Sequence, residues 1–181
     1  MTHLNIEFKA KTNNSISLEQ KLLSLSPQFV GEDHQRDTYY DVQIGRLKLR
    51  EGNIENALIW YQREDVAGAK QSDILLYKHA PDDALKQIIT KLHGIKIVVD
   101  KIRKIYFVEN VKFHFDRVEG LGLFIEVEAI DSTGEIGLEK LKEQCDFYIN
   151  YFDIQQSDFM HKSYSDMMMD IIEENLKSES K

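Results

Sequence analysis

The chain has 181 residues, one cysteine and a formal net charge of −8, with 42% hydrophobic and 30% charged residues. The length favours a single domain, which we expect to span 1–177, with a frayed polar tail at 178–181. Cys145 has no partner for an internal disulfide, and no apolar run reaches the roughly 20 residues that cross a bilayer. Together with the negative charge, this predicts a cytoplasmic protein that binds neither nucleic acid nor membranes.

Short stretches of alternating apolar and polar residues, rich in β-branched and aromatic types, predict strands, and 3.6-residue periodicity predicts helices. In chain order we expect a strand at 3–11, a helix at 18–25, strands at 34–42, 45–51, 56–63 and 71–79, a helix at 81–94, strands at 96–108, 111–118 and 122–131, and helices at 135–151 and 163–176. Ser17 is the predicted N-cap of the first helix. Tight turns between neighbouring strands indicate antiparallel pairing and an α+β fold.

Charged side chains recur at every second residue of the predicted strands, so they share one face. They are Glu7, Lys9, Lys11, Arg46, Lys48, Arg50, Arg63, Lys101, Arg103, Lys112, His114, Asp116, Glu126 and Glu128. His114 shares its face with a Lys and an Asp, which suits either general acid–base chemistry or the orientation of a neighbour.

An open sheet with one solvated face would give the same alternation. Two features favour a closed barrel with a charged lumen instead. The strand at 45–51 presents only cations on its polar face, and an anion is needed to offset their repulsion. Carboxylates are grouped on other strands, where they suit Mg²⁺ or Mn²⁺. Cations and carboxylates on one surface are what a metal-bound polyphosphate requires, and eight strands suffice to close a barrel.

The strand Asn5-Ile6-Glu7-Phe8-Lys9 resembles the Glu-x-Glu-x-Lys strand of the CYTH, or triphosphate tunnel, family, with Asn5 in place of the first Glu. The resemblance continues through 37–40, 45–51, 101–108, 115–122, 124–128 and 163–166, in the family's order, and is greatest to the class IV adenylate cyclase branch. It implies an eight-stranded antiparallel barrel with helices packed outside, a requirement for Mg²⁺ or Mn²⁺, a homodimer in many members, and conversion of ATP to cyclic AMP and pyrophosphate.

The resemblance also implies roles for individual residues. Glu7 and Glu126 would be metal ligands, with Glu128 and Asp116 as helpers. The phosphates would be held by Lys9, Arg50, Arg63, Lys101 and Arg103. The side chains of Lys11, Arg46, Lys48 and Lys112 are expected to face the same lumen and contact the substrate.

Two other functions suit the same lumen. A triphosphatase would hydrolyse inorganic or thiamine triphosphate with an activated water at the terminal phosphorus. A non-catalytic protein would bind a nucleotide or polyphosphate without turnover. Asn5 bears on this choice, because one carboxylate fewer weakens a second metal site.

Overall fold

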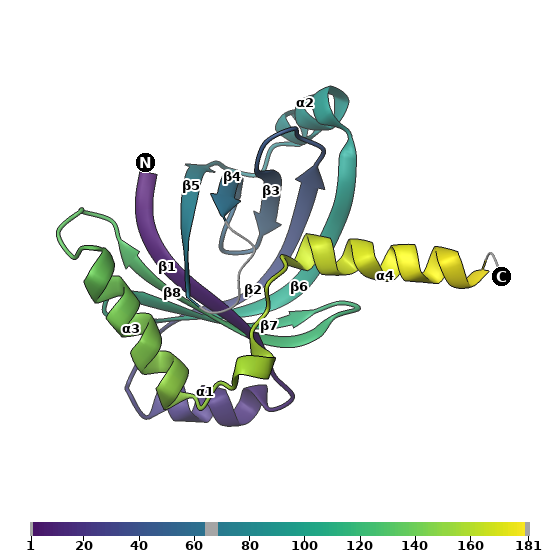
Figure 1. Ribbon diagram of the computed structural model, residues 1–181. Helices are drawn as coiled ribbons and strands as arrows, with labels where there is room; N and C mark the ends of the chain where they lie inside the picture. Colours follow the sequence, from purple (N-terminus) through teal and green to yellow (C-terminus); the bar gives the residue numbers. More distant parts are fainter. Residues whose placement is uncertain (1, 64–68, 180–181) are drawn as a thin grey trace.

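The computed structural model describes residues 2–63 and 69–179, and Figure 1 shows the arrangement of its strands and helices. The strands are β1 (Thr2–Lys11), β2 (Gln28–Tyr40), β3 (Arg46–Gly52), β4 (Ala57–Arg63), β5 (Lys70–Lys78), β6 (Ile95–Val108), β7 (Val111–Val118) and β8 (Gly122–Asp131). The helices are α1 (Ser15–Leu23), α2 (Asp83–His93), α3 (Leu138–Tyr151) and α4 (Tyr164–Glu179), with a 3-10 turn at Gln156–Asp158. Each predicted strand and helix is therefore confirmed.

The eight strands close into an antiparallel barrel in the order β1, β5, β4, β3, β2, β6, β7, β8, with β8 returning to β1. This confirms the α+β barrel. Residues that face each other across a strand pair point to the same side of the sheet, so the register decides which side chains share the lumen. Lys9 pairs with Glu126, and Lys48 pairs with Ile59.

Helix α3 covers the outside of the barrel over β1 and β8, and α1 lies beside it at the lower end in Figure 1. The main core lies at this contact. Phe113, Leu141 and Cys145 have no exposed surface there. The Phe113 ring packs edge-on against Tyr148 of α3, with ring centroids 4.7 Å apart. The alternation in the strands thus gives an apolar outer face under this helix.

Several boundaries differ from the sequence-based expectation. Helix α1 begins at Ser15, and its N-cap is Asn14, whose side chain accepts a hydrogen bond from the backbone N–H of Ser17. The predicted cap at Ser17 is therefore wrong, because Asn is an equally good cap and lies one turn earlier. Strand β2 begins at Gln28 rather than 34, and an irregularity at Gly31 lets the pairing with β6 continue through the bend. Helix α4 continues to Glu179 instead of ending at 176.

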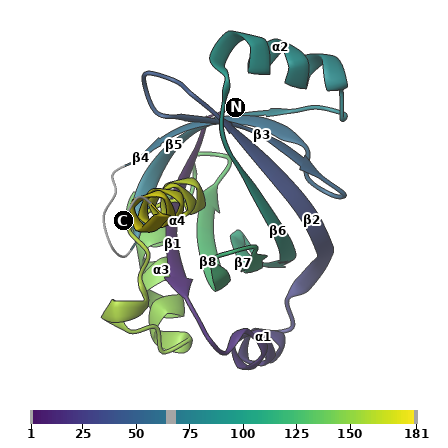
Figure 2. The ribbon, with the colours of Figure 1, turned by 90° about the vertical axis from the view of Figure 1, so that its right-hand side faces the viewer.

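The chain between α3 and α4 returns to the rim of the barrel. Phe159 forms an isolated bridge with Ala10, and the Met160 N–H donates to the Lys9 carbonyl at 2.9 Å. This attachment places Ser163 and Tyr164 at the lumen, and α4 then projects away from the barrel, as the view in Figure 2 along the helix shows. Within residues 2–63 and 69–179, no helix has the length and apolar character needed to span a membrane.

The aromatic contact under α3 gives a stability prediction. Phe113→Ala should lower the free energy of unfolding by about 3–5 kcal/mol, because it removes a fully buried ring from a close-packed core. Phe147 lies on α3, where it is 55% exposed. Phe147→Ala should therefore lower the free energy of unfolding by less than about 1 kcal/mol. Urea denaturation of the two variants measures this difference, and equal losses would contradict the core assignment.

Candidate functional site: a charged lumen

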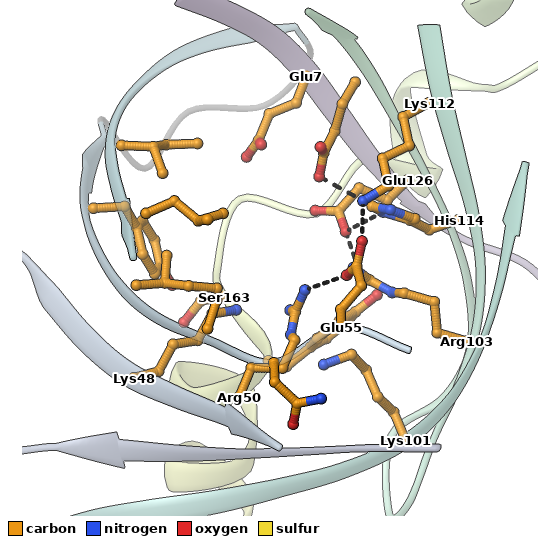
Figure 3. A pocket seen from close by; sticks show the side chains of 18 of the residues that line it. Glu7, Lys48, Arg50, Glu55, Lys101, Arg103, Lys112, His114, Glu126 and Ser163 are labelled. Atoms are coloured by element: carbon orange, nitrogen blue, oxygen red, sulfur yellow. Dashed lines mark hydrogen bonds and ion pairs between the residues drawn. The ribbon is translucent and has the colours of Figure 1, made fainter. Parts of the chain in front are cut away.

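Charged side chains from most of the strands converge on a cavity of about 390 Å³ inside the barrel (Figure 3). Among the described residues, seven cations and four carboxylates line it, namely Lys9, Lys48, Arg50, Lys78, Lys101, Arg103, Lys112, Glu7, Glu55, Glu126 and Glu128. The cavity therefore carries an excess of cations, although the whole chain has a net charge of −8. An anion is attracted to this interior and not to the outer surface as a whole.

Asp37 on β2 holds three of these cations. Its carboxylate accepts hydrogen bonds from Lys101 Nζ at 2.7 Å, from Lys48 Nζ at 3.0 Å, and from Arg50 Nε and Nη2 at 2.8 and 3.0 Å. Burial alone would raise the pKa of Asp37, but the three cations outweigh it and hold this pKa well below its usual value. Burial and the nearby Arg50 lower the pKa of Lys101 to about 7, despite its contact with Asp37. One carboxylate does not neutralise three cations, so this side of the cavity keeps positive charge.

Arg103 on β6 is fixed from two sides. Its Nε and Nη2 donate to Asp116 of β7 at 2.6 and 2.5 Å, and Nη2 also donates to Glu126 of β8 at 2.8 Å. The hydroxyl of Tyr164 donates to Asp116 at 2.7 Å. Asp116 is thus engaged by Arg103 and Tyr164, and it is not among the described residues that line the cavity. We infer that Asp116 positions the Arg103 guanidinium, whereas the sequence suggested an auxiliary metal ligand.

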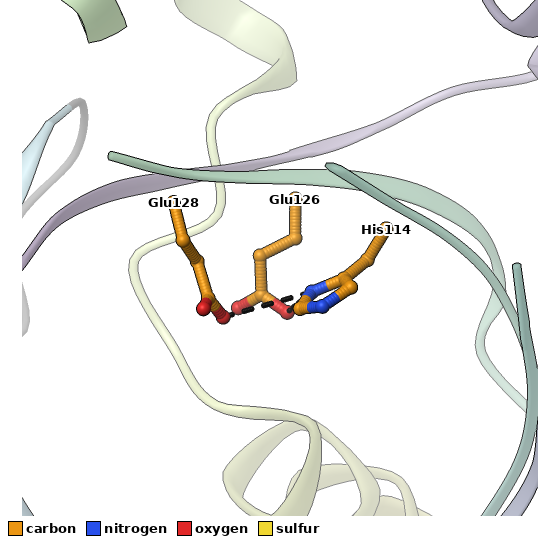
Figure 4. A group of neighbouring side chains, drawn as sticks. All are labelled: His114, Glu126 and Glu128. Carbon is orange, nitrogen blue, oxygen red and sulfur yellow. Dashed lines mark hydrogen bonds and ion pairs between the residues drawn. The ribbon is translucent and has the colours of Figure 1, made fainter. Parts of the chain in front are cut away.

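An imidazole and two carboxylates lie together on β7 and β8 (Figure 4). Ligand atoms of His114, Glu126 and Glu128 lie within 4.8 Å of one another. His114 Nδ1 is 3.3 Å from Glu126 Oε2 and 3.6 Å from Glu128 Oε1. Lys9 Nζ donates to the other oxygen of Glu126 at 2.7 Å. Glu7 faces Glu128 directly across the β1–β8 pair. Side chains of three strands, the carboxylates of β1 and β8 and the imidazole of β7, therefore meet at one place.

The protonation of this cluster shows how its charges are balanced. Burial and the adjacent Glu126 raise the pKa of Glu128 to about 7. Burial, reinforced by Arg103, lowers the pKa of His114 to about 3, so the imidazole is neutral at neutral pH. The neutral imidazole of His114 suits metal ligation. The carboxylate of Glu128 retains a proton near neutral pH because the nearby cations do not compensate its charge. The donor set therefore fits a divalent ion that accepts both oxygen and nitrogen ligands.

Glu55, in the loop between β3 and β4, extends into the lumen. Its carboxylate accepts hydrogen bonds from Lys112 Nζ at 2.5 Å, from Arg50 Nη1 at 3.0 Å and from Gln35 Nε2 at 3.1 Å. Burial would raise the pKa of Glu55, but Lys112 and Arg50 lower it far below its usual value. The buried carboxylate of Asp33 fixes the loop by accepting the backbone N–H groups of 54 and 55 at 2.9 and 3.0 Å. Glu55 thus occupies two cations that come from different strands, β3 and β7.

Most of the charged residues predicted from sequence do share this lumen, but besides Asp116 three others do not line it or cannot be placed. Lys11 is exposed at the rim, with its Nζ 5.9 Å from the centre of the Phe124 ring. Arg46 donates to Asp166 of α4 at 2.8 Å, outside the described cavity wall. The side chain of Arg63 lies outside the described residues. The roles assigned to the other residues stay predictions.

Sequence reasoning missed several residues that complete the site, among them Asp37, Glu55, Tyr39, Lys78, His79, Ser163 and Tyr164. The alternation of β2 was a usable signal for Asp37, because it lies two residues from Tyr39 on the same face. Glu55 gave no such signal, since it belongs to a loop whose direction depends on Asp33. His79 lies in the loop between β5 and α2, is half-buried and lines the cavity.

Residues 3–164 match the CYTH domain family. A "putative adenylate cyclase" of Methanocaldococcus jannaschii is 26% identical over 177 residues, which cover 91% of this chain and 98% of that protein. The X-ray structure of a putative adenylate cyclase from Vibrio parahaemolyticus superposes with a TM-score of 0.76 at 19% identity, over 93% of this chain and 99% of that one.

A third similar protein comes from Hippeastrum and is described as a putative adenylyl cyclase with a dominant triphosphatase activity. It superposes with a TM-score of 0.57 at 14% identity, over 89% of this chain and 91% of that one. These two structural likenesses concern the fold. The family match, by contrast, spans most of the sequence and includes every strand of the barrel, and on this ground the chain belongs to the CYTH domain family.

Proposed function

We propose that this protein is a metal-dependent enzyme of the class IV adenylate cyclase type, which converts ATP to cyclic AMP and pyrophosphate inside the barrel. One observation carries the proposal. A single buried cavity joins seven cations to a cluster of carboxylates and an imidazole. Such a cavity is suited to a metal-bound triphosphate, whose several negative charges need both kinds of partner. The name of the Methanocaldococcus jannaschii relative supports the same choice.

In this proposal Glu126, Glu128 and His114 hold Mg²⁺ or Mn²⁺, with Glu7 as the next ligand across the strand pair. The ion, when bound, supplies positive charge to the phosphate oxygens and stabilises the leaving pyrophosphate. It also replaces the proton that Glu128 otherwise holds near neutral pH. The phosphate oxygens would bind the neighbouring cations of the lumen, among them Arg50 and Lys112 once Glu55 is displaced from them.

The cationic residues are proposed to bind and orient the triphosphate. Arg50 and Arg103 present planar guanidinium groups that can each contact two oxygens, while Lys101 and Lys112 act as point charges. Arg103 is held by Asp116, so its direction is set before the substrate enters. Cyclisation needs the ribose 3′-hydroxyl in line with the α-phosphorus, and a rigid set of phosphate contacts restricts the nucleotide to few orientations.

A triphosphatase is the second candidate. The described activity of the Hippeastrum protein supports it, because that protein shares the barrel. Asn5 bears on the choice between the two activities. This residue stands where the family motif has its first Glu, is 4% exposed, and its Oδ1 has no hydrogen-bond partner among the described residues. With one carboxylate fewer, the metal site differs from that of the full motif.

The products of ATP turnover test the choice between these activities. We expect purified protein with ATP and Mn²⁺ to form cyclic AMP and pyrophosphate in equal amounts, and EDTA to abolish the reaction. Chromatographic separation of the nucleotides measures this. ADP and phosphate in place of cyclic AMP would contradict the cyclase and support the triphosphatase. Binding of ATP without any product would contradict both.

The metal site gives a second prediction. Glu128→Gln should raise the Mn²⁺ concentration for half-maximal activity by about 10–100-fold, because it removes a charged ligand and leaves the volume unchanged. Glu119→Gln, at an exposed position in the turn between β7 and β8, is the matched control and should leave the Mn²⁺ dependence as it is. A Glu128→Gln enzyme with the normal Mn²⁺ dependence would remove this residue from the proposed metal site.

Glu55 gives a third prediction. A bound triphosphate has to displace this carboxylate from Arg50 and Lys112, so Glu55→Gln should tighten tripolyphosphate binding several-fold. Hydrogen bonds to charged groups contribute about 1.5–3 kcal/mol each, and a neutral amide at position 55 lowers the part of this that the ligand must replace. Calorimetric titration in the presence of Mg²⁺ measures the change. Weaker binding by the Glu55→Gln variant would show that Glu55 assists the ligand and does not compete with it.

A further inference from the structure

One wall of the lumen has a different chemistry from the rest. The cavity-facing side chains of β4 and β5 include Ile59, Ile74 and Leu76, and Ala57 and Tyr61 extend the same surface. Ile59 and Leu76 face each other across the strand pair, as do Tyr61 and Ile74, so they form a continuous patch. In Figure 3 the labelled groups Arg103, Lys112 and His114 lie at the right of the cavity.

This apolar wall departs from the simple expectation of charged side chains inside and apolar ones outside. β1, β3, β6, β7 and β8 each bring at least one charged side chain to the cavity, and β2 brings Asp37 beneath it. In β4 the described cavity-facing residues are all uncharged, and in β5 the charge of Lys78 lies only at the end of the strand. The two strands are neighbours in the barrel, so the apolar surface is a single area.

The ring order sets what this wall faces. In a closed barrel of eight strands, the strand four places away lies across the lumen. Four places from β4 is β7, and four places from β5 is β6. The apolar wall therefore faces the strands that carry Lys101, Arg103, Lys112 and His114. A molecule spanning the cavity meets cations and His114 on one side and hydrocarbon on the other, and Glu126 and Glu128 lie on β8, next to β7.

From this arrangement we propose that the β4–β5 wall binds the organic group of a nucleoside triphosphate and selects such substrates over inorganic tripolyphosphate. The inference rests on the proposed function, since it assumes that phosphates occupy the charged side. Phosphate oxygens gain nothing from Ile59, Ile74 or Leu76, whereas a base and sugar bury apolar surface there and release water. The cavity volume of about 390 Å³ lies within the range of pockets for small organic ligands.

Adjacent residues of β5 offer a matched control, because alternation sends them to opposite faces. Leu76 faces the cavity, while Leu75 lies on the outer face and is 51% exposed. A polar substitution at Leu75 tests the effect on the strand itself. The same substitution at Leu76 tests the wall.

The experiment compares two ligands by calorimetric titration with Mg²⁺: α,β-methylene ATP, which resists cyclisation, and tripolyphosphate. The double variant Ile74→Ser/Leu76→Ser should bind the nucleotide about tenfold or more weakly, the effect expected for lost apolar contacts, and bind tripolyphosphate within twofold of the natural chain. Leu75→Ser should change neither affinity. Because a double variant can lose its fold, Ile59→Phe serves as a second test, which should narrow the cavity, weaken nucleotide binding and spare tripolyphosphate.

An equal loss of affinity for both ligands in folded variants would overturn the inference while the proposed function stands, because the wall would then support only the fold. Binding of tripolyphosphate without binding of the nucleotide by the natural chain would overturn both the inference and the proposed cyclase. If the natural chain binds neither ligand, the proposed function fails, and the inference fails with it.

Discussion

Closure of the barrel forces buried charges to neutralise one another, and the rest of the structure depends on this constraint. Two opposite charges about 4 Å apart attract with about 4 kcal/mol at the effective dielectric constant of a partly wet protein site. An isolated buried charge is far less favourable. The lumen therefore holds its cations through carboxylates on neighbouring strands, such as Asp37 beneath Arg50 and Asp116 behind Arg103. These pairs keep the cationic groups in place before any ligand arrives.

The balance is incomplete, and this makes the lumen a binding site. The lowered pKa of Lys101 and the raised pKa of Glu128 mark two places where burial disfavours the charged form and the neighbours do not restore it. A bound anion near Lys101 and a bound cation near Glu128 would each stabilise the charged form of that side chain. A metal-bound triphosphate supplies both the anion and the cation. Its organic group needs an apolar surface, and the wall of β4 and β5 offers one.

Much of this arrangement could be predicted from the sequence. The charged pairs Glu7 and Lys9, or Lys101 and Arg103, are separated by one apolar residue, and this alternation is a local property of each strand. Antiparallel order followed from short turns, and closure followed from the number of strands. What depends on contacts between distant segments could not be predicted. Glu55 enters the lumen only because Asp33 binds its backbone, and Ile74 becomes part of a ligand wall only through the position of β5 in the ring.

The central claim is that the metal and the phosphates share one lumen. Anomalous scattering from crystals grown with Mn²⁺ and α,β-methylene ATP tests it most directly. The account predicts an Mn²⁺ peak within coordination distance of the Glu126 and Glu128 carboxylates, with phosphate density between that peak and Arg50. A peak and nucleotide located only on the outer surface of the barrel, with the lumen still closed by its own ion pairs, would contradict the account.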